Sequence, residues 1–387
     1  MRMRNAGPSP SRLTDAGSVW LDLLRAVAAS LVMVGHVRGL FLVDYASVDS
    51  PGTLMAALYL LTGLGHQAVM IFFVLSGYFI AASVLGAMRE ERWSWRWYAQ
   101  RRWMRLTIVL WPALALGALL DGAGLWLFGI DGPYGASESY RHIVPVPVTE
   151  RFGWETALGN AFYLQEIFVS PFGSNGPLWS LSYEFWYYAL FPALMVACFG
   201  RCTIVPRLVH ALVAIAIATL VGERILLYFT IWLLGVMAFL APLPVIFLRD
   251  GWPRRVVLAG AGTALLAAMA LLRLGGLPGF AADLAVAVAC ALLVALLQAA
   301  PGQPSPRLAR LAPKLAGFSY TLYLAHLPPL VFGAAAIVAA GGARWQPDAV
   351  SLAAAAAIAM AVFAYAYGLS RLTEAKTAWL RARLFGD

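Results

Sequence analysis

Two ionisable side chains lie in one strongly apolar segment near the start of the chain. Residues 21–42 read LDLLRAVAASLVMVGHVRGLFL and contain Arg25 and His36. The segment is long enough to cross a bilayer, where an ionisable group costs at least about 2.5 kcal/mol and usually faces a cavity, a partner or a substrate path. On a helix the two side chains project from one face, roughly 16 Å apart along the axis. A lone arginine can instead snorkel to the headgroups and a lone histidine can simply pack, but their shared face favours chemistry.

A carboxylate in another apolar segment is expected at the depth of His36. Residues 178–188 read LWSLSYEFWYY and hold Glu184 about two helical turns below the expected outer end of that span. A carboxylate at such a depth is costly unless it is paired, and a carboxylate on one imidazole nitrogen raises the basicity of the other. We therefore expect Glu184 to orient His36 for catalysis. A purely structural buried pair is the alternative.

Three more polar side chains are expected near the middle of the membrane. Ser76 lies in GHQAVMIFFVLSGYFI, and Tyr320 and His326 lie in GFSYTLYLAHLPPL. They are candidates for contacts to a substrate carbonyl or to an acceptor. The alternatives are a serine bonded to its own helix and tyrosines that only pack.

The segment ERWSWRWYAQRRWMRL, residues 91–106, alternates arginine with tryptophan. Arg101, Arg102 and Arg105 bring three cations to one short stretch, and arginine binds phosphate in a bidentate manner. An anion site is one interpretation. Anchoring at the membrane surface is the other, because arginine prefers headgroups and tryptophan prefers the interface.

The composition indicates a polytopic membrane protein. Of 387 residues, 61% are apolar and 12% are charged, whereas a soluble domain is nearer one half apolar and one quarter charged. We predict an all-α membrane protein with ten transmembrane helices. The predicted spans are 19–43, 65–87, 104–128, 178–199, 207–222, 225–247, 255–273, 280–299, 315–340 and 349–369.

The distribution of positive charge sets the predicted topology. Lysine and arginine concentrate in the segments that lie inside when both termini are cytoplasmic, as the positive-inside rule requires. The net charge of +9 therefore needs no nucleic acid as a partner. The predicted regions are a disordered cytoplasmic tail at 1–18, a membrane domain at 19–370 with an outer loop at 129–177, and a basic cytoplasmic tail at 371–387. The three cysteines show no metal-ligand spacing, and no metal is expected.

These placements suggest a path for a long phosphorylated ligand. Its phosphates would bind the inner arginines, and a thin arm would run past Arg25 to His36. The pantetheine arm of coenzyme A has about the reach of the roughly 16 Å offset on the first helix. An acyl thioester would then arrive beside His36, and a hydroxyl acceptor would enter from the outer face.

Four stretches in this order resemble the membrane-bound acyltransferase-3 family: LDLLRAVAASLVMVGH, FFVLSGYFI, LWSLSYEFWYY and SYTLYLAH. The resemblance covers about residues 20 to 370. It implies ten spans, an acyl-CoA donor, O-acylation of carbohydrates and other acceptors, and essential roles for Arg25 and His36, with Glu184 as the acid of its motif. One departure is Gln67-Ala68-Val69, where the family often has Gly-Val.

The predicted function is transfer of a short acyl group from acetyl-CoA, or another short acyl-CoA, to a hydroxyl. The acceptor would be a sugar, a polysaccharide, a lipid-linked saccharide or a glycosylated metabolite. His36 would act as general base or carry the acyl group transiently. The expected location is a bacterial inner membrane. A proton-coupled transporter is the rival interpretation, because buried His, Glu and Arg also suit a proton path.

Overall fold

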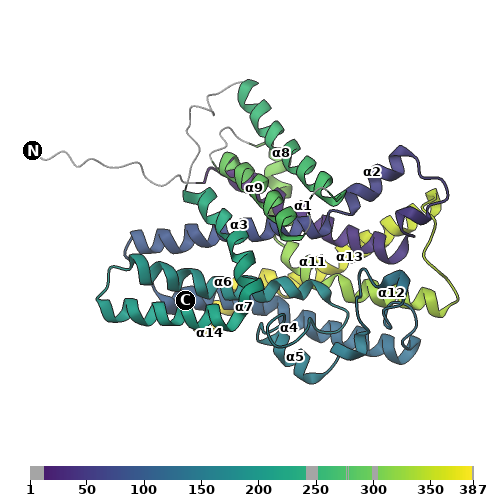
Figure 1. Ribbon diagram of the computed structural model, residues 1–387, viewed down its shortest axis with the longest axis horizontal. Coiled ribbons are helices and arrows are strands. Elements are labelled where there is room, and N and C mark those ends of the chain that lie inside the picture. The colour runs from purple at the N-terminus through teal and green to yellow at the C-terminus, as the bar shows by residue number, and fades with distance from the viewer. Residues whose placement is uncertain (1–12, 241–251, 276, 278, 299–303, 386–387) are drawn as a thin grey trace, which may run out of the picture. The chain divides into compact units, whose positions relative to one another are not determined.

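The computed structural model describes residues 13–240, 252–275, 277, 279–298 and 304–385. Within these residues the regular structure is helical, with two isolated β-bridges and no strand (Figure 1). The predicted all-α class is confirmed. The α-helices are α1 (Asp15–Phe41), α2 (Thr53–Thr62), α3 (Gly65–Arg89), α4 (Trp95–Phe128), α5 (Trp154–Ala161), α6 (Trp179–Phe199), α7 (Ile204–Leu240), α8 (Trp252–Arg273), α9 (Gly279–Leu297), α10 (Pro306–Ala316), α11 (Ser319–Ala325), α12 (Leu327–Ala339), α13 (Ala349–Leu372) and α14 (Thr377–Phe385).

Short 3₁₀ turns join several of these helices. They are η1 (Tyr45–Ser47), η2 (Glu138–Tyr140), η3 (Val148–Arg151), η4 (Gly176–Leu178) and η6 (Glu374–Lys376). Two of them, η2 and η3, lie with α5 in the predicted outer loop 129–177, and η4 begins at the end of this loop. This loop is therefore built from short helical turns in the described structure.

Seven helices in the described part of the chain are long and apolar enough to cross a membrane, or up to eight if one bent pair counts as a single span. They confirm a polytopic membrane protein. The total of ten spans and the cytoplasmic side of both termini stay predictions. The predicted tail 1–18 lies mostly outside the described residues, and α1 already begins at Asp15.

The predicted boundary between the spans 207–222 and 225–247 coincides with a break inside α7. Gly222 has φ 77° and ψ 174°, which is not helical. A positive φ of this kind is accessible to glycine without a steric penalty, because glycine has no Cβ. Gly222 therefore divides α7 into two helical segments.

The chain forms two compact units. The first comprises residues 1–28, 70–86 and 230–316, and the second comprises residues 29–69, 87–229 and 317–387. Parts of α1, α3 and α7 belong to each unit. In the first unit α8 packs against α9, and in the second α4 contacts α11 and α12 while α11 also contacts α13 (Figure 1).

Two glycines let α3 and α7 approach closely in the first unit. A Cβ on Gly77 would lie 2.0 Å from the carbonyl oxygen of Trp232, and a Cβ on Gly235 would lie 1.9 Å from that of Val74. The Trp232 indole Nε1 also donates a hydrogen bond to Ser76 Oγ at 3.1 Å. Small residues at a helix crossing allow this kind of backbone approach within a membrane.

We expect Gly77→Ala to lower the unfolding temperature of the purified protein clearly. The added methyl meets a backbone oxygen that no rotamer change can move, and overpacking of this kind costs about 1–3 kcal/mol. Gly86→Ala is the matched control on the same helix, because a Cβ at Gly86 meets nothing within 4 Å. Since alanine is also the better helix former, the control should keep or raise the unfolding temperature. Equal unfolding temperatures for the two variants would contradict the packing argument.

Candidate active site

His36 and His326 form a hydrogen-bonded pair in the second unit. His36 lies on α1, and His326 lies between α11 and α12. The distance from His36 Nδ1 to His326 Nε2 is 2.7 Å, and the two rings stack with their centroids 5.0 Å apart. His326 is fully buried, whereas His36 stays partly accessible. Of the pair, His36 is therefore the residue closer to the accessible surface.

The surroundings of His326 determine which nitrogen of each neutral ring carries the proton. His326 Nδ1 lies 2.9 Å from the carbonyl oxygens of both Leu322 and Tyr323. A carbonyl oxygen only accepts, so this nitrogen must be the donor, and His326 Nε2 is then an acceptor. His36 Nδ1 therefore donates to His326, which leaves the lone pair of His36 on Nε2. This is the tautomer of a general base or a nucleophile.

A break in the helix places His326. The helical stretch ending at Ala325 meets α12 at 52°, and Pro328 and Pro329 follow directly. Pro328 has no amide hydrogen, so it cannot donate the helical hydrogen bond to the carbonyl of Leu324 four residues earlier. The amide Nδ2 of Asn175 donates to that carbonyl at 2.7 Å. The segment before α6 thus replaces the missing backbone donor and fixes the break.

A second cluster surrounds Glu184 at α6. The hydroxyl of Tyr188, one turn further along, donates to the Glu184 carboxylate. Arg105 of α4 lies near enough to interact electrostatically with Glu184 and Tyr320. The Tyr320 hydroxyl donates to the Leu106 carbonyl at 3.2 Å and so ties α11 to α4. Tyr320 belongs to this cluster, and His326 follows it by six residues, which is about 9 Å of helix rise. The cluster and the histidine pair are therefore about that far apart along residues 320–326.

The three predicted arginines of α4 lie in different surroundings. The Arg101 guanidinium lies 3.9 Å from the centre of the Trp97 ring, and both side chains are exposed. The Arg102 guanidinium lies 5.6 Å from the centre of the Tyr98 ring and 5.9 Å from that of Tyr188. Arg105 is exposed although it lies among buried aromatic rings. A ligand can therefore reach Arg105 beside Glu184.

The structure separates the predicted site residues into groups. His36 and His326 are in contact, and Arg105, Glu184 and Tyr320 form the second cluster. Arg25 lies on the same helix as His36 but in the first unit, where its Nη2 is 2.8 Å from the Asp22 carboxylate. Ser76 is also in the first unit, where it accepts the hydrogen bond from the Trp232 indole.

The expected hydrogen bond between Glu184 and His36 is replaced by two others. His36 bonds to His326, and Glu184 bonds to Tyr188. Position along a helix predicts depth in the membrane but not the direction in which a side chain points, and Tyr188 lies on the same face as Glu184 one turn away. The sequence contains an indication of the histidine pair. His36 and His326 both lie in apolar segments, where a buried polar ring must form a hydrogen bond.

The acyltransferase-3 family model, described as an acyltransferase domain, matches residues 18–370. The match covers nearly the whole chain, and it begins and ends within a few residues of the predicted membrane domain. The chain belongs to this family. No curated protein and no solved structure matches the chain.

In this acyltransferase the C-terminal end of α1 carries polar residues that the sequence analysis does not identify. Arg344, which precedes α13, pairs with Asp44 through two bonds of 2.7 and 3.1 Å. The His142 ring lies over Gly39, where an added Cβ would be 2.9 Å from its Nε2. Gly39 follows His36 by three residues on α1, so these groups lie one turn away from the histidine pair. No pattern in the sequence singles them out.

The ion pair between Asp44 and Arg344 makes stability depend on pH. The hydrogen bond from Arg344 lowers the pKa of Asp44 below its usual value, so the pair stabilises the folded protein above the unfolded pKa of about 4. The contribution is lost as the pH falls through the lowered folded pKa. Asp44→Asn should lower the free energy of unfolding at pH 7 by at most about 1 kcal/mol, as is usual for a partly exposed pair, and by less at pH 3.

The control for this experiment is Asp49→Asn. Asp49 is exposed in the same loop and forms no ion pair within the described part of the chain. The control variant should unfold like the parent at both pH values. A difference between Asp44→Asn and the parent that is as large at pH 3 as at pH 7 would contradict the assignment.

Proposed function

We propose that this acyltransferase moves a short acyl group, in the simplest case acetyl, from acyl-CoA to a hydroxyl of a carbohydrate or a glycosylated acceptor. The observation that supports the proposal most strongly is the hydrogen bond from His36 Nδ1 to His326 Nε2. It leaves a basic nitrogen on an accessible ring within a membrane helix. A hydroxyl acceptor needs such a base, because the alcohol is a weak nucleophile at neutral pH.

The proposed step proceeds as follows. The acceptor hydroxyl donates to His36 Nε2, its oxygen attacks the thioester carbonyl carbon, and Nε2 takes the proton. The carbon–sulfur bond then breaks, and the leaving thiolate receives that proton from Nε2. The products are an ester on the acceptor and free coenzyme A. The imidazolium that forms in between keeps its hydrogen bond from Nδ1 to His326.

The same tautomer also suits a nucleophilic role for His36, in which Nε2 carries the acyl group itself. Rapid quenching of the protein mixed with radiolabelled acetyl-CoA distinguishes the two routes. The base route predicts no acid- or base-labile label on the protein. A label that is absent from His36→Ala would assign the nucleophilic route.

The donor is proposed to bind between the arginines of α4 and His36. Arg105 is accessible beside Glu184 and Tyr320, with Arg101 and Arg102 as flanking cations. Glu184, held by Tyr188, would orient the Arg105 guanidinium toward a phosphate. Arg25 is proposed to contact the donor along its arm or to stabilise the developing thiolate. Ser76 is also proposed as a contact for the thioester.

The proposed location is the inner membrane of a bacterium, with the donor on the cytoplasmic side. Basic residues cluster at the start of α4, which suits the cytoplasmic face. The acceptor would enter from the side of the loop 129–177. A sugar, a polysaccharide, a lipid-linked saccharide or a glycosylated metabolite would each present the required hydroxyl.

Binding and slow hydrolysis of acetyl-CoA by the purified protein test this proposal. The parent protein should bind acetyl-CoA and release coenzyme A slowly, with water as a poor acceptor. Arg25→Ala should bind acetyl-CoA more weakly by about tenfold or more, as loss of a charged contact predicts. Arg201→Ala is the control, since Arg201 is an exposed arginine paired with Glu91. Failure of the parent to bind any acyl-CoA would refute the proposal and favour a carrier.

A further inference from the structure

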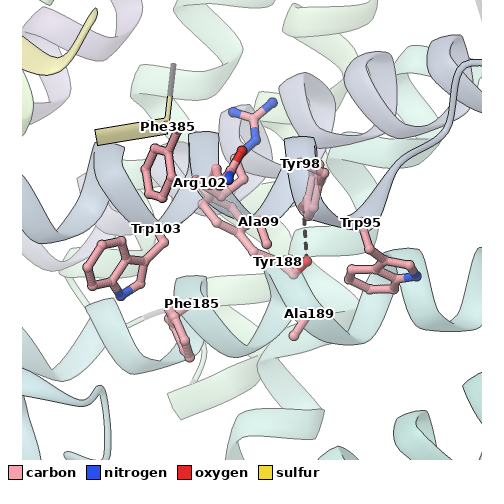
Figure 2. A pocket seen from close by; sticks show the side chains of 10 residues that line it. Trp95, Tyr98, Ala99, Arg102, Trp103, Phe185, Tyr188, Ala189 and Phe385 are labelled. Carbon is pink, nitrogen blue, oxygen red and sulfur yellow. Dashed lines mark hydrogen bonds between the residues drawn. The ribbon is translucent and has the colours of Figure 1, made fainter. Parts of the chain in front are cut away.

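An apolar cavity of about 410 Å³ lies in the second unit, where the start of α4 faces α6 and the end of α14. Trp95, Ala99 and Trp103 of α4 form one wall, Phe185 and Ala189 of α6 form another, and Phe385 of α14 covers one end (Figure 2). This volume is within the range of about 300–1,000 Å³ that is typical of ligand pockets. The histidine pair does not line the cavity, whereas Arg102, a flanking cation of the proposed donor site, and Tyr188, which holds Glu184, do.

Two aromatic polar groups of the cavity wall are bonded to protein partners. Trp95 Nε1 donates to His210 Nε2 at 2.7 Å, and the Tyr98 hydroxyl donates to the Tyr188 carbonyl at 3.0 Å (Figure 2). The Tyr188 hydroxyl donates to Glu184. A purine or a sugar would lose its hydrogen bonds to water in such a cavity and regain few of them. A hydrocarbon chain makes no hydrogen bonds to water and so loses none on entering the cavity. The lining therefore favours an alkyl chain as the occupant.

The cavity has a cation at its edge. Arg102 is among the lining residues, and its Nε is buried and makes no hydrogen bond to any described residue. Its guanidinium lies beside the rings of Tyr98 and Tyr188. Trp103 is 39% exposed, which suits the interface between headgroups and hydrocarbon. An alkyl chain in the cavity would thus have an anionic group within reach of Arg102.

We propose that this cavity binds one acyl chain of an anionic membrane phospholipid, with the lipid phosphate at Arg102. The basic segment at the start of α4 supports a charged headgroup, because Arg96 and Arg101 are exposed close by. Arg102 thus lies at the edge of the lipid cavity and also flanks the proposed donor site, whereas Arg105 interacts with Glu184 and Tyr320.

The bound lipid would touch the second cluster of the site. Tyr188 forms part of the cavity wall with its ring and holds Glu184 with its hydroxyl. The same lipid chain would pack against Phe385 and so attach α14 to α4. The lipid is therefore a structural ligand of this region.

Native mass spectrometry of the full chain tests the proposal. The purified protein is mixed in detergent with phosphatidylglycerol and phosphatidylcholine of identical chains, and retained lipid is counted. The parent should retain about five times as much phosphatidylglycerol as phosphatidylcholine. One arginine near an anionic headgroup contributes about this factor to binding. Arg102→Gln should abolish that preference, and Ala99→Phe, which fills the cavity, should lower retention of both lipids by about tenfold.

Two further variants complete the test. Ala357→Phe places the same ring at an exposed position of α13 outside the cavity and should retain lipid like the parent. Phe385→Ala opens the covered end near the chain terminus and should release lipid faster. Unchanged retention in Ala99→Phe, or an equal loss in Ala357→Phe, would overturn the proposal. Displacement of the lipid by coenzyme A would also overturn it and assign the cavity to the donor.

Discussion

His36→Ala is expected to lower acyl transfer by about 10²–10⁴-fold, the usual contribution of a general base. Binding of acyl-CoA should change little, because the proposed contacts to the donor phosphates come from arginines. The physical reason is the lone pair on His36 Nε2, which His326 cannot supply in its place. His326 is fully buried, and its Nδ1 is bonded to two carbonyls. Initial rates with acetyl-CoA and a hydroxyl acceptor measure the effect.

His210→Gln is the matched control for this loss. His210 bonds to Trp95 and to the Pro206 carbonyl, on another helix and away from His36. Its replacement should leave the rate within about twofold of the parent, as is usual for substitutions outside a site. A comparable loss in both variants would show that histidine replacement damages the fold. A His36→Ala protein that transfers acyl groups at the parent rate would exclude His36 as base and as nucleophile.

His326→Leu is expected to lower kcat by about 10²-fold, with a small change in KM for acyl-CoA. Leucine offers no acceptor to His36 Nδ1, so the ring can turn and the proton can move to Nε2, where it blocks the base. His326 is therefore a positioning residue that acts through His36. Steady-state kinetics across a pH series measure the effect, because loss of the partner should also shift the pH at which the rate rises.

His326→Gln separates positioning from simple packing. The side-chain amide oxygen of glutamine can accept from His36 Nδ1, so this variant should regain about tenfold of the rate lost in His326→Leu. Unfolding temperatures of both variants are measured alongside. An equal loss in the two variants, matched by an equal fall in unfolding temperature, would indicate a structural role alone.

Much of the fold follows from simple features of the sequence. Long apolar runs predict the helices, and Gly222 lies at a predicted boundary because glycine tolerates the positive φ found there. Gly77 lies where α7 approaches α3 closely, as a residue without a Cβ allows. The break at His326 agrees with the pair Pro328-Pro329. These features are local, so they can be recognised without knowing which helices become neighbours.

Contacts between distant segments could not be predicted in the same way. Glu184 and His36 can be placed at one depth from the sequence, yet the direction of each side chain depends on helix rotation, and Glu184 bonds to Tyr188 within its own helix. Ser76 meets Trp232 because α7 crosses α3 at the two glycines. The pairing of Asp44 with Arg344 joins residues 300 positions apart. In each case the partner is decided by packing that only the folded chain defines.

The two prolines after His326 have a consequence for how substrate binding is used. The prolines restrict the backbone at the kink, and the Asn175 side-chain amide donates to the Leu324 carbonyl there, so the histidine pair is already oriented before any ligand arrives. Binding energy from the donor is then not consumed in ordering the base and remains for holding the thioester in place. The enzyme should show no lag or slow activation on mixing with substrates.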